Sequence, residues 1–219
     1  MIKFKDVGKW YHNNTLKALD NINIDIQSGE FVFLHGHSGS GKTTFLHLIF
    51  REIIPTKGEI FVDKVKISDL PDKKIPLLRR KIGVVFQDFK LLYNKTSFHN
   101  IYYVMRVSGT SKKDAIVKTE QILKDVGLWY KRDAYPHYLS AGEQQRLSIA
   151  RALVANPSII LADEPTGNLD FENSLNVLEL LKNINLKGAT VIMATHNLQL
   201  LQRHNKARTI KLSEGRLES

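Results

Sequence analysis

Residues 31–50 read FVFLHGHSGSGKTTFLHLIF, and this stretch decides how the rest of the sequence is interpreted. An apolar run, Phe31 to Leu34, enters a glycine cluster, and the chain leaves the cluster as an apolar segment of helical character. Gly36 to Thr43 fits the pattern G-x-x-x-x-G-K-[ST]. This order of strand, glycine loop and helix predicts a mononucleotide-binding unit in an α/β fold.

The glycine loop predicts a site for a polyphosphate. Glycines allow successive backbone N–H groups to face phosphate oxygens, and the N-terminus of the following helix adds partial positive charge. The Lys42 ammonium is expected to reach the β and γ phosphates, and the Thr43 hydroxyl to bind Mg²⁺. The other loop positions expected to contact the nucleotide are Gly36, His37, Ser38, Gly39, Ser40, Gly41 and Thr44. A flexible turn before an ordinary helix is the alternative, which the preceding strand disfavours.

Length and composition fit a globular protein. The 219 residues suffice for one sizeable core with a small inserted lobe, and 42% hydrophobic and 25% charged residues are ordinary globular usage. The absence of Cys excludes disulfides, thiolate metal sites and a Cys nucleophile. The first residues are polar, and no apolar run nears the roughly 18 residues that span a bilayer. We expect a cytoplasmic protein whose membrane contact comes through a partner.

The chain is basic, with 32 Lys and Arg against 22 Asp and Glu. A net charge of +10 is compatible with nucleic acid, an anionic membrane surface, a bound polyphosphate or an evenly basic surface. No basic stripe interleaved with aromatic residues supports the first option. We therefore expect no nucleic-acid partner.

Apolar patterning divides the chain into strand-rich and helical parts. Ile22, Ile24 and Ile26 alternate with polar residues, which predicts a half-buried strand, and residues 61–67 predict another. The later runs IGVVF, SIILA and ATVIMA are typical of strands buried on both faces in a parallel sheet.

The middle of the chain has a helical pattern that begins near residue 88. Within this stretch, Ser111 and Asp114 are typical of a helix start, and apolar residues on one helical face follow them. We expect a single domain in which residues 1–87 and 157–219 form the core and residues 88–156 form an inserted helical subdomain.

Two carboxylates end the buried run IILADE. Asp163 and Glu164 sit where such a strand end faces either a functional crevice or simply water. Beside a phosphate loop the first interpretation is favoured. Asp163 would then hold Mg²⁺, most simply through water, and Glu164 would orient or deprotonate the attacking water.

Residues 139–146 read LSAGEQQR. Taken alone, Ser140 with Glu143 three positions later predicts a helix start with a capping box. The segment also resembles the signature that separates ABC ATPases from other phosphate-loop enzymes. By that resemblance Ser140, Gly142 and Glu143, at the N-terminus of their helix, would meet the γ-phosphate of ATP bound by the opposite copy.

Four further marks follow in the order of the ABC family: Tyr11, Gln87 after IGVVF, Asn168 to Asp170 in TGNLD, and His196 in MATH. Singly, each has an ordinary interpretation, such as a packing aromatic, a surface amide or a loop histidine. Jointly they extend the resemblance over nearly the whole chain. It implies that Tyr11 stacks on adenine, that Gln87 belongs to the nucleotide and Mg²⁺ site, and that Asp170 lies near the other copy. His196 would contact the γ-phosphate, so Glu164 and His196 are the predicted catalytic residues.

The resemblance implies a phosphate-loop ATPase with a mostly parallel core sheet, an N-terminal antiparallel β region and the helical insertion. It also implies ATP and Mg²⁺ as ligands and a homodimer that closes on ATP. LADEPTGNLD and GEQQR resemble the group that serves cell-division, lipoprotein-export and macrolide-export membrane proteins, and the cell-division members resemble the chain most. The chain would then lie on the cytoplasmic face of the plasma membrane, held by an integral partner.

Three alternatives remain open at this point. The client could be a lipoprotein-release or macrolide-export protein, or the chain could be a soluble ABC protein acting on DNA or the ribosome. It could also be a nucleotide-gated scaffold with negligible turnover.

The sequence departs from the family pattern at three positions, of which Ala141 bears on the mechanism. Gly is usual there, and Ala would restrict the backbone if the site needs a positive φ. Asn197 and Tyr93 are the other two departures. We also expected Phe89, Leu91 and Leu92 to line a groove for a helix of the membrane partner, with burial in the helical subdomain as the alternative.

Overall fold

The structure is a computed structural model that describes residues 1–11, 16–204 and 206–218. Its strands are β1 (Ile2–Tyr11), β2 (Leu16–Ile26), β3 (Phe31–His35), β4 (Lys57–Val62), β5 (Val65–Lys66), β6 (Ile82–Val85), β7 (Ile159–Asp163), β8 (Thr190–Thr195), β9 (Arg208–Ser213) and β10 (Arg216–Glu218). Its α-helices are α1 (Lys42–Ile49), α2 (Ile75–Arg79), α3 (Ser97–Val107), α4 (Lys112–Asp125), α5 (Ala141–Leu153), α6 (Phe171–Leu186) and α7 (Leu198–Gln202). Short 3₁₀ turns cover Asp72–Lys74, Trp129–Lys131 and Pro136–Tyr138.

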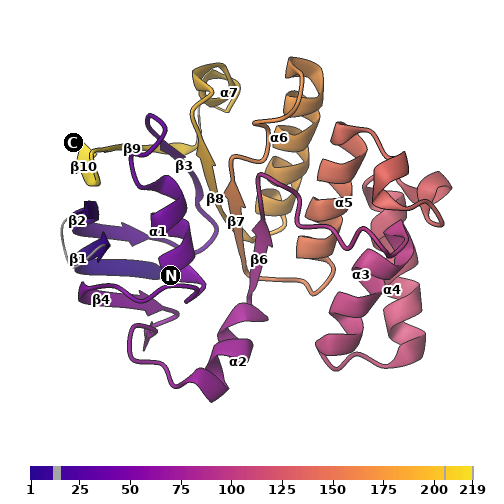
Figure 1. Ribbon diagram of the computed structural model, residues 1–219, viewed down its shortest axis with the longest axis horizontal. Helices are drawn as coiled ribbons and strands as arrows, with labels where there is room; N and C mark the ends of the chain where they lie inside the picture. Colours follow the sequence, from indigo (N-terminus) through magenta and orange to yellow (C-terminus); the bar gives the residue numbers. More distant parts are fainter. Residues whose placement is uncertain (12–15, 205, 219) are drawn as a thin grey trace.

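Two sheets form the α/β core (Figure 1). One is antiparallel with the strand order β2-β1-β4-β5, and the other has the order β10-β9-β3-β8-β7-β6. All neighbours in the second sheet are parallel except β10 and β9. The predicted fold class is confirmed: a mostly parallel sheet, an antiparallel N-terminal region and an α-helical part.

The central strands are apolar because they are covered on both faces. Every residue of β7 and of β8 is buried, as the runs SIILA and ATVIMA predicted. Parallel pairing aligns Phe31 of β3 with Val191 of β8, and Ile159 of β7 with Thr190 of β8. The carboxyl ends of β3, β7 and β8 therefore meet at one edge of the sheet.

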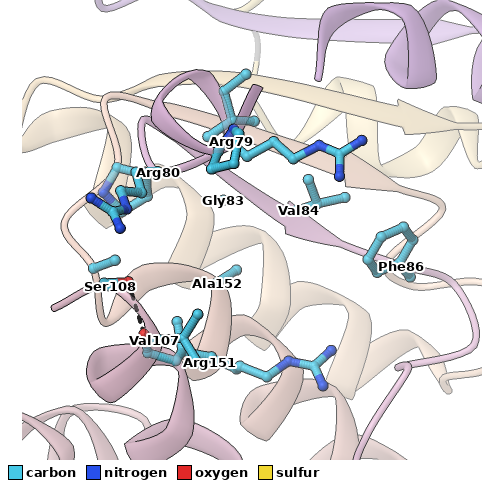
Figure 2. A pocket seen from close by; sticks show the side chains of 14 residues that line it. Arg79, Arg80, Gly83, Val84, Phe86, Val107, Ser108, Arg151 and Ala152 are labelled. Carbon is cyan, nitrogen blue, oxygen red and sulfur yellow. Dashed lines mark hydrogen bonds between the residues drawn. The ribbon is translucent and has the colours of Figure 1, made fainter. Parts of the chain in front are cut away.

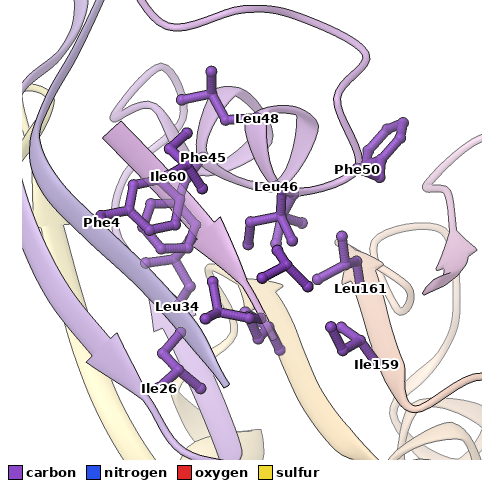
Figure 3. Packing of buried hydrophobic residues seen from close by; sticks show 14 of the residues in the cluster. Phe4, Ile26, Leu34, Phe45, Leu46, Leu48, Phe50, Ile60, Ile159 and Leu161 are labelled. Carbon is purple, nitrogen blue, oxygen red and sulfur yellow. The ribbon is translucent and has the colours of Figure 1, made fainter. Parts of the chain in front are cut away.

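The antiparallel sheet packs on helix α1. The rings of Phe4 and Phe45 stack with centroids 4.5 Å apart, within a cluster that also holds Ile26, Leu34 and Leu161 (Figure 3). This packing fixes where α1 begins relative to the sheets. The strand expected over residues 61–67 is interrupted, because Asp63 and Lys64 turn with φ of 50° and 65° and separate β4 from β5.

The helical part has its own apolar cluster. It consists of residues between Phe89 and Val154, with Leu180 of α6 packed against it. Helix α4 begins where predicted, since the Ser111 side chain accepts a hydrogen bond from the backbone N–H of Asp114. In the part of the chain that the structure describes, no helix is long and apolar enough to cross a membrane.

Candidate active site

The phosphate loop opens onto a cavity of about 640 Å³ at the carboxyl ends of β3, β7 and β8. Its lining comes from five segments of the chain: β2, the loop and the start of α1, the loop after β6, the end of β7 and the end of β8. The lining residues are Ala18, His37, Ser38, Gly39, Gly41, Lys42, Thr43, Thr44, Gln87, Glu164 and His196. All but Ala18 are predicted site residues.

Two positions of the loop require glycine because neighbouring backbone carbonyls leave no room for a Cβ. A Cβ added to Gly36 would lie 2.1 Å from the Leu212 carbonyl oxygen of β9, and one added to Gly41 would lie 2.4 Å from the Ala18 carbonyl oxygen of β2. Both residues also have positive φ, which residues with a Cβ rarely adopt. Neither Gly36 nor Ser40 lines the cavity, and both support the loop from behind.

Lys42 is held in place before any phosphate arrives. Its side chain is only 5% exposed, and its ammonium donates hydrogen bonds to the carbonyls of Gly36 at 2.9 Å and His37 at 3.0 Å. The same nitrogen lies 3.3 Å from Oε1 of Glu164. A buried cation thus has its partners, and its orientation toward the cavity is fixed.

Glu164 joins Lys42 to His196. Its Oε2 lies 2.7 Å from Nδ1 of His196, whose side chain is 61% exposed. The Glu164 backbone is in the left-handed region with φ of 44°, and its N–H donates to the Ala194 carbonyl of β8. This sharp turn directly after β7 aims the carboxylate across the sheet edge toward the end of β8. The two predicted catalytic side chains are therefore in direct contact.

Asp163 lies beneath the cavity and does not line it. It is 8% exposed, and burial raises the pKa of its carboxyl, although a hydrogen bond with the Thr43 side chain opposes the shift. Its Oδ1 is buried and has no hydrogen-bond partner among the described residues. An unpaired carboxylate oxygen beside a hydroxyl fits Mg²⁺, which prefers oxygen ligands.

The described residues contain no cluster of three or more His, Cys, Asp or Glu that could hold a metal by itself. A cation at Thr43 and Asp163 would therefore need phosphate oxygens and water to complete its shell, as Mg²⁺ does in nucleotide sites.

Gln87 reaches the cavity from the loop that follows β6. Its backbone carbonyl accepts a hydrogen bond from Nδ2 of Asn168 at 3.2 Å, and its side-chain nitrogen would lie 3.3 Å from a Cβ added to Gly167. The segment after Glu164 thus packs against the Gln87 loop.

Two positions in the N-terminal strands concern the nucleotide cavity, and the stacking of Tyr11 on adenine stays a prediction. Tyr11 is half-buried at the end of β1, is not among the lining residues of the cavity, and has the Lys9 ammonium 5.0 Å from its ring centroid. Ala18 of β2 lines the cavity although it was not predicted. A single alanine in a strand carries no sequence signal for such a role.

The family comparison agrees with this geometry. The pattern of the family described as "ABC transporter" matches residues 19–167, which is more than half of the chain. The chain belongs to the ABC transporter family. It is an ABC ATPase subunit, as the phosphate loop, the carboxylates after β7 and the LSAGEQQR segment together predicted.

Similar proteins cover almost all of this ABC subunit. "Cell division ATP-binding protein FtsE" of Streptococcus pneumoniae (serotype 2) is 45% identical over 99% of this chain and 94% of its own length. The proteins of the same name from Bacillus subtilis and Escherichia coli K12 are 46% and 42% identical, over 98% and 99% of this chain and 93% and 97% of their own lengths.

Among solved structures, the dimeric ATP-binding cassette MJ0796 in a post-hydrolysis state with ADP and Pi superimposes with a TM-score of 0.91. It is 38% identical and covers 100% of this chain and 97% of its own.

The ABC signature is well formed but lies outside the cavity. Ser140 caps α5, accepting from the Glu143 N–H at 3.2 Å, while its own N–H donates to Oε2 of Glu143 at 2.8 Å. The Tyr130 hydroxyl donates to Oε1 of Glu143 at 2.6 Å. Burial alone would raise the pKa of Glu143, but these hydrogen bonds outweigh it and leave the pKa below its usual value. The predicted capping box is confirmed, and none of Ser140, Gly142 and Glu143 lines the cavity.

Ala141 and Gly142 differ in what their positions tolerate. Ala141 is exposed, opens α5 and has no positive φ, so the restriction considered from the sequence does not arise. A Cβ on Gly142, in contrast, would lie 2.6 Å from Oδ1 of Asn173 at the start of α6. Asp170 caps that helix by accepting from the Asn173 N–H at 2.8 Å. The signature therefore abuts the segment that contains Asp170.

Proposed function

We propose that this ABC ATPase is the nucleotide-driven subunit of a bacterial cell-division complex, with the integral membrane protein FtsX as its partner. The support is the identity of 42–46% to FtsE proteins over nearly the full length of both chains. The subunit would lie on the cytoplasmic face of the membrane and would be attached only through that partner.

The contact chain Lys42, Glu164 and His196 is the single observation that carries the catalytic proposal. The oxygens of a bound triphosphate carry more charge than one carboxylate. They would therefore replace Oε1 of Glu164 as the partner of the Lys42 ammonium. The freed carboxylate would accept a proton from the attacking water. His196, still beside Oε2, would help to hold that water in line with the γ-phosphate.

Thr43, Asp163 and Gln87 are the residues that would hold Mg²⁺. When bound, the ion neutralises charge on the β and γ phosphates as it develops during hydrolysis. Asp163 suits this role because its buried Oδ1 is otherwise unpaired.

Two copies are needed because one copy holds only half of the contacts. The cavity is lined by the loop, Glu164 and His196, whereas Ser140 and Gly142, at the N-terminus of α5, do not line it. In a twofold dimer each signature would face the triphosphate held by the other copy, with its N–H groups directed at the γ-phosphate. ATP would then close the pair, and hydrolysis would reopen it.

A groove of about 490 Å³ lies between the core and the helical part (Figure 2). None of the expected residues lines this groove. Leu91 is 6% exposed and packs in the helical cluster, as the alternative held, Phe89 packs against that cluster, and Leu92 is 43% exposed. The groove is instead lined by Phe86, by apolar residues of β6 and α3, and by three arginines. The described lining residues include no carboxylate. We assign this groove to a cytoplasmic helix of the membrane partner with an apolar face and an acidic residue.

Co-purification from native membranes tests the partner. The full-length chain, tagged and extracted with a mild detergent, should carry an FtsX-type protein. Recovery of a lipoprotein-release or macrolide-export protein instead would reject the cell-division function and keep the ATPase.

Val107→Glu tests the groove, since Val107 lines it and is 81% exposed. The new charge should abolish co-purification while leaving ATP binding intact. Val117→Glu is the matched control, because Val117 is 58% exposed on α4 and is not a groove residue. Equal retention of the partner by both variants would refute this docking site.

A further inference from the structure

The loop after β6 carries a conformation that its own sequence does not favour. Phe89 and Lys90 have φ of 58° and 49°, and neither is glycine. Two consecutive residues with a Cβ in the left-handed region are sterically unfavourable, so contacts from outside the loop must hold them. Gln87, which lines the nucleotide cavity, lies two residues before this turn.

Those contacts come from the far end of helix α5. The Arg151 guanidinium donates through Nη2 to the Phe89 carbonyl at 2.8 Å and through Nη1 to the Lys90 carbonyl. Ser148, one turn earlier, donates its hydroxyl to the same Phe89 carbonyl at 3.2 Å. One side chain thus grips two successive carbonyls of the turn, with the planar fork that arginine has and lysine lacks.

Among the described residues, Arg151 has no ion pair that would compete with these contacts. Burial lowers the pKa of its guanidinium, and no acidic group among the described residues contributes to that shift. Hydrogen bonds from a charged donor to backbone carbonyls are stronger than neutral ones, the more so out of water. The two carbonyls are therefore the principal partners of a largely buried cation.

We propose that Arg151 is a positioning residue for ATP hydrolysis, which fixes Gln87 at the nucleotide cavity by holding the Phe89–Lys90 turn. Helix α5 also connects Arg151 to the signature. It begins with the signature cap Ser140, and from there to Arg151 it is a rigid rod of about 16 Å at 1.5 Å per residue. The position of Gln87 in one site is therefore tied to the signature that serves the other site.

Arg106→Lys supplies a matched control. Arg106 lies on α3 and does not line the groove, and its Nη1 donates to the Thr110 backbone carbonyl at 2.7 Å. That carbonyl follows α3 and lies outside the loop that carries Gln87. Both variants keep the positive charge and lose the planar fork of an arginine. A general effect of losing an arginine–carbonyl contact therefore affects both variants, whereas a misplaced Gln87 affects only Arg151→Lys.

The experiment uses the full-length protein and measures four quantities for Arg151→Lys, Arg106→Lys and the wild type. Arg151→Lys should lower kcat for ATP about tenfold, since it loses one of two charged hydrogen bonds, and should raise the Mg²⁺ concentration for half-maximal rate. Affinity for ATP without Mg²⁺ should stay within about twofold, because the loop and Lys42 are untouched. Amide exchange at residues 86–90 should accelerate.

Arg106→Lys should leave kcat, the Mg²⁺ requirement and exchange at residues 86–90 unchanged. An equal loss of kcat in both variants, or wild-type kcat and exchange in Arg151→Lys, would overturn the positioning role. Should Arg151→Lys fail to fold, Ser148→Ala decides, because it removes one contact to the same carbonyl. It should produce the same pattern at reduced size, and a wild-type pattern would refute the proposal.

Discussion

The core and the helical part of this ABC subunit present their functional groups in opposite ways. In the core, Glu164 already contacts both Lys42 and His196 in a cavity at the edge of the sheet. In the helical part, Ser140 and Glu143 satisfy each other and Tyr130, away from that cavity. One half of the site is assembled within one chain. On the proposed function, the other half would contact the ATP bound by a second chain.

Lys42→Ala should have the largest effect, because it removes the buried ammonium at the centre of the assembled half. Loss of several charge-assisted contacts to phosphate should weaken ATP binding by at least about a hundredfold. Equilibrium binding of a fluorescent ATP analogue measures this, with Lys118→Ala on the exposed face of α4 as control. Binding at wild-type affinity would mean that the cavity is not the nucleotide site.

Glu164→Gln should separate binding from chemistry. The amide cannot accept a proton, so phosphate release should fall about 10²- to 10⁴-fold while ATP affinity is retained or increases. The increase is expected because Gln no longer competes for the Lys42 ammonium. Glu172→Gln, in the first turn of α6, is the control. Equal slow hydrolysis by wild type and Glu164→Gln would favour a nucleotide-gated scaffold.

Mixing two inactive variants tests whether the signature of one copy acts on the ATP bound by the other copy. Lys42→Ala removes the ammonium from the nucleotide cavity. Ser140→Arg blocks the signature and also removes a helix cap worth about 1 kcal/mol. In an equal mixture, half of the dimers are mixed and each has one intact composite site, so activity should recover to about a quarter of wild type. A mixture as inactive as its components would exclude a site shared between copies.

Ala141→Gly should have the smallest effect. Ala141 begins α5 and has no positive φ, so glycine offers no needed freedom there and lowers stability by at most about 1 kcal/mol. Steady-state hydrolysis should stay within about twofold of wild type. A marked rise in kcat would show that the signature adopts a different backbone when the two copies close.

The assembled half was largely predictable because its signals are local. The glycine loop, the carboxylates after IILA and the His196 loop each follow an apolar run, and parallel strands bring such ends together. The groove was less predictable: Phe89 and Leu91 have the same apolar character whether they face a partner or a core, and only packing against α3 and α5 separates the two. Arg151 gave no signal at all, because its carbonyl partners are some 60 residues away in sequence.

The glycine loop rests on the last strands of the described chain. Gly36 abuts the Leu212 carbonyl, and Gly215, in the turn between β9 and β10, donates its N–H to the Ser40 carbonyl at 3.1 Å. On the ribosome the loop emerges long before these strands are made. A nascent chain can complete its first strands and helix α1 and still lack the residues that pack behind the loop. We therefore expect nucleotide capture only after residues 208–215 have been made. Fusions or truncations that disturb residues 208–215 should be judged as changes to the nucleotide site itself.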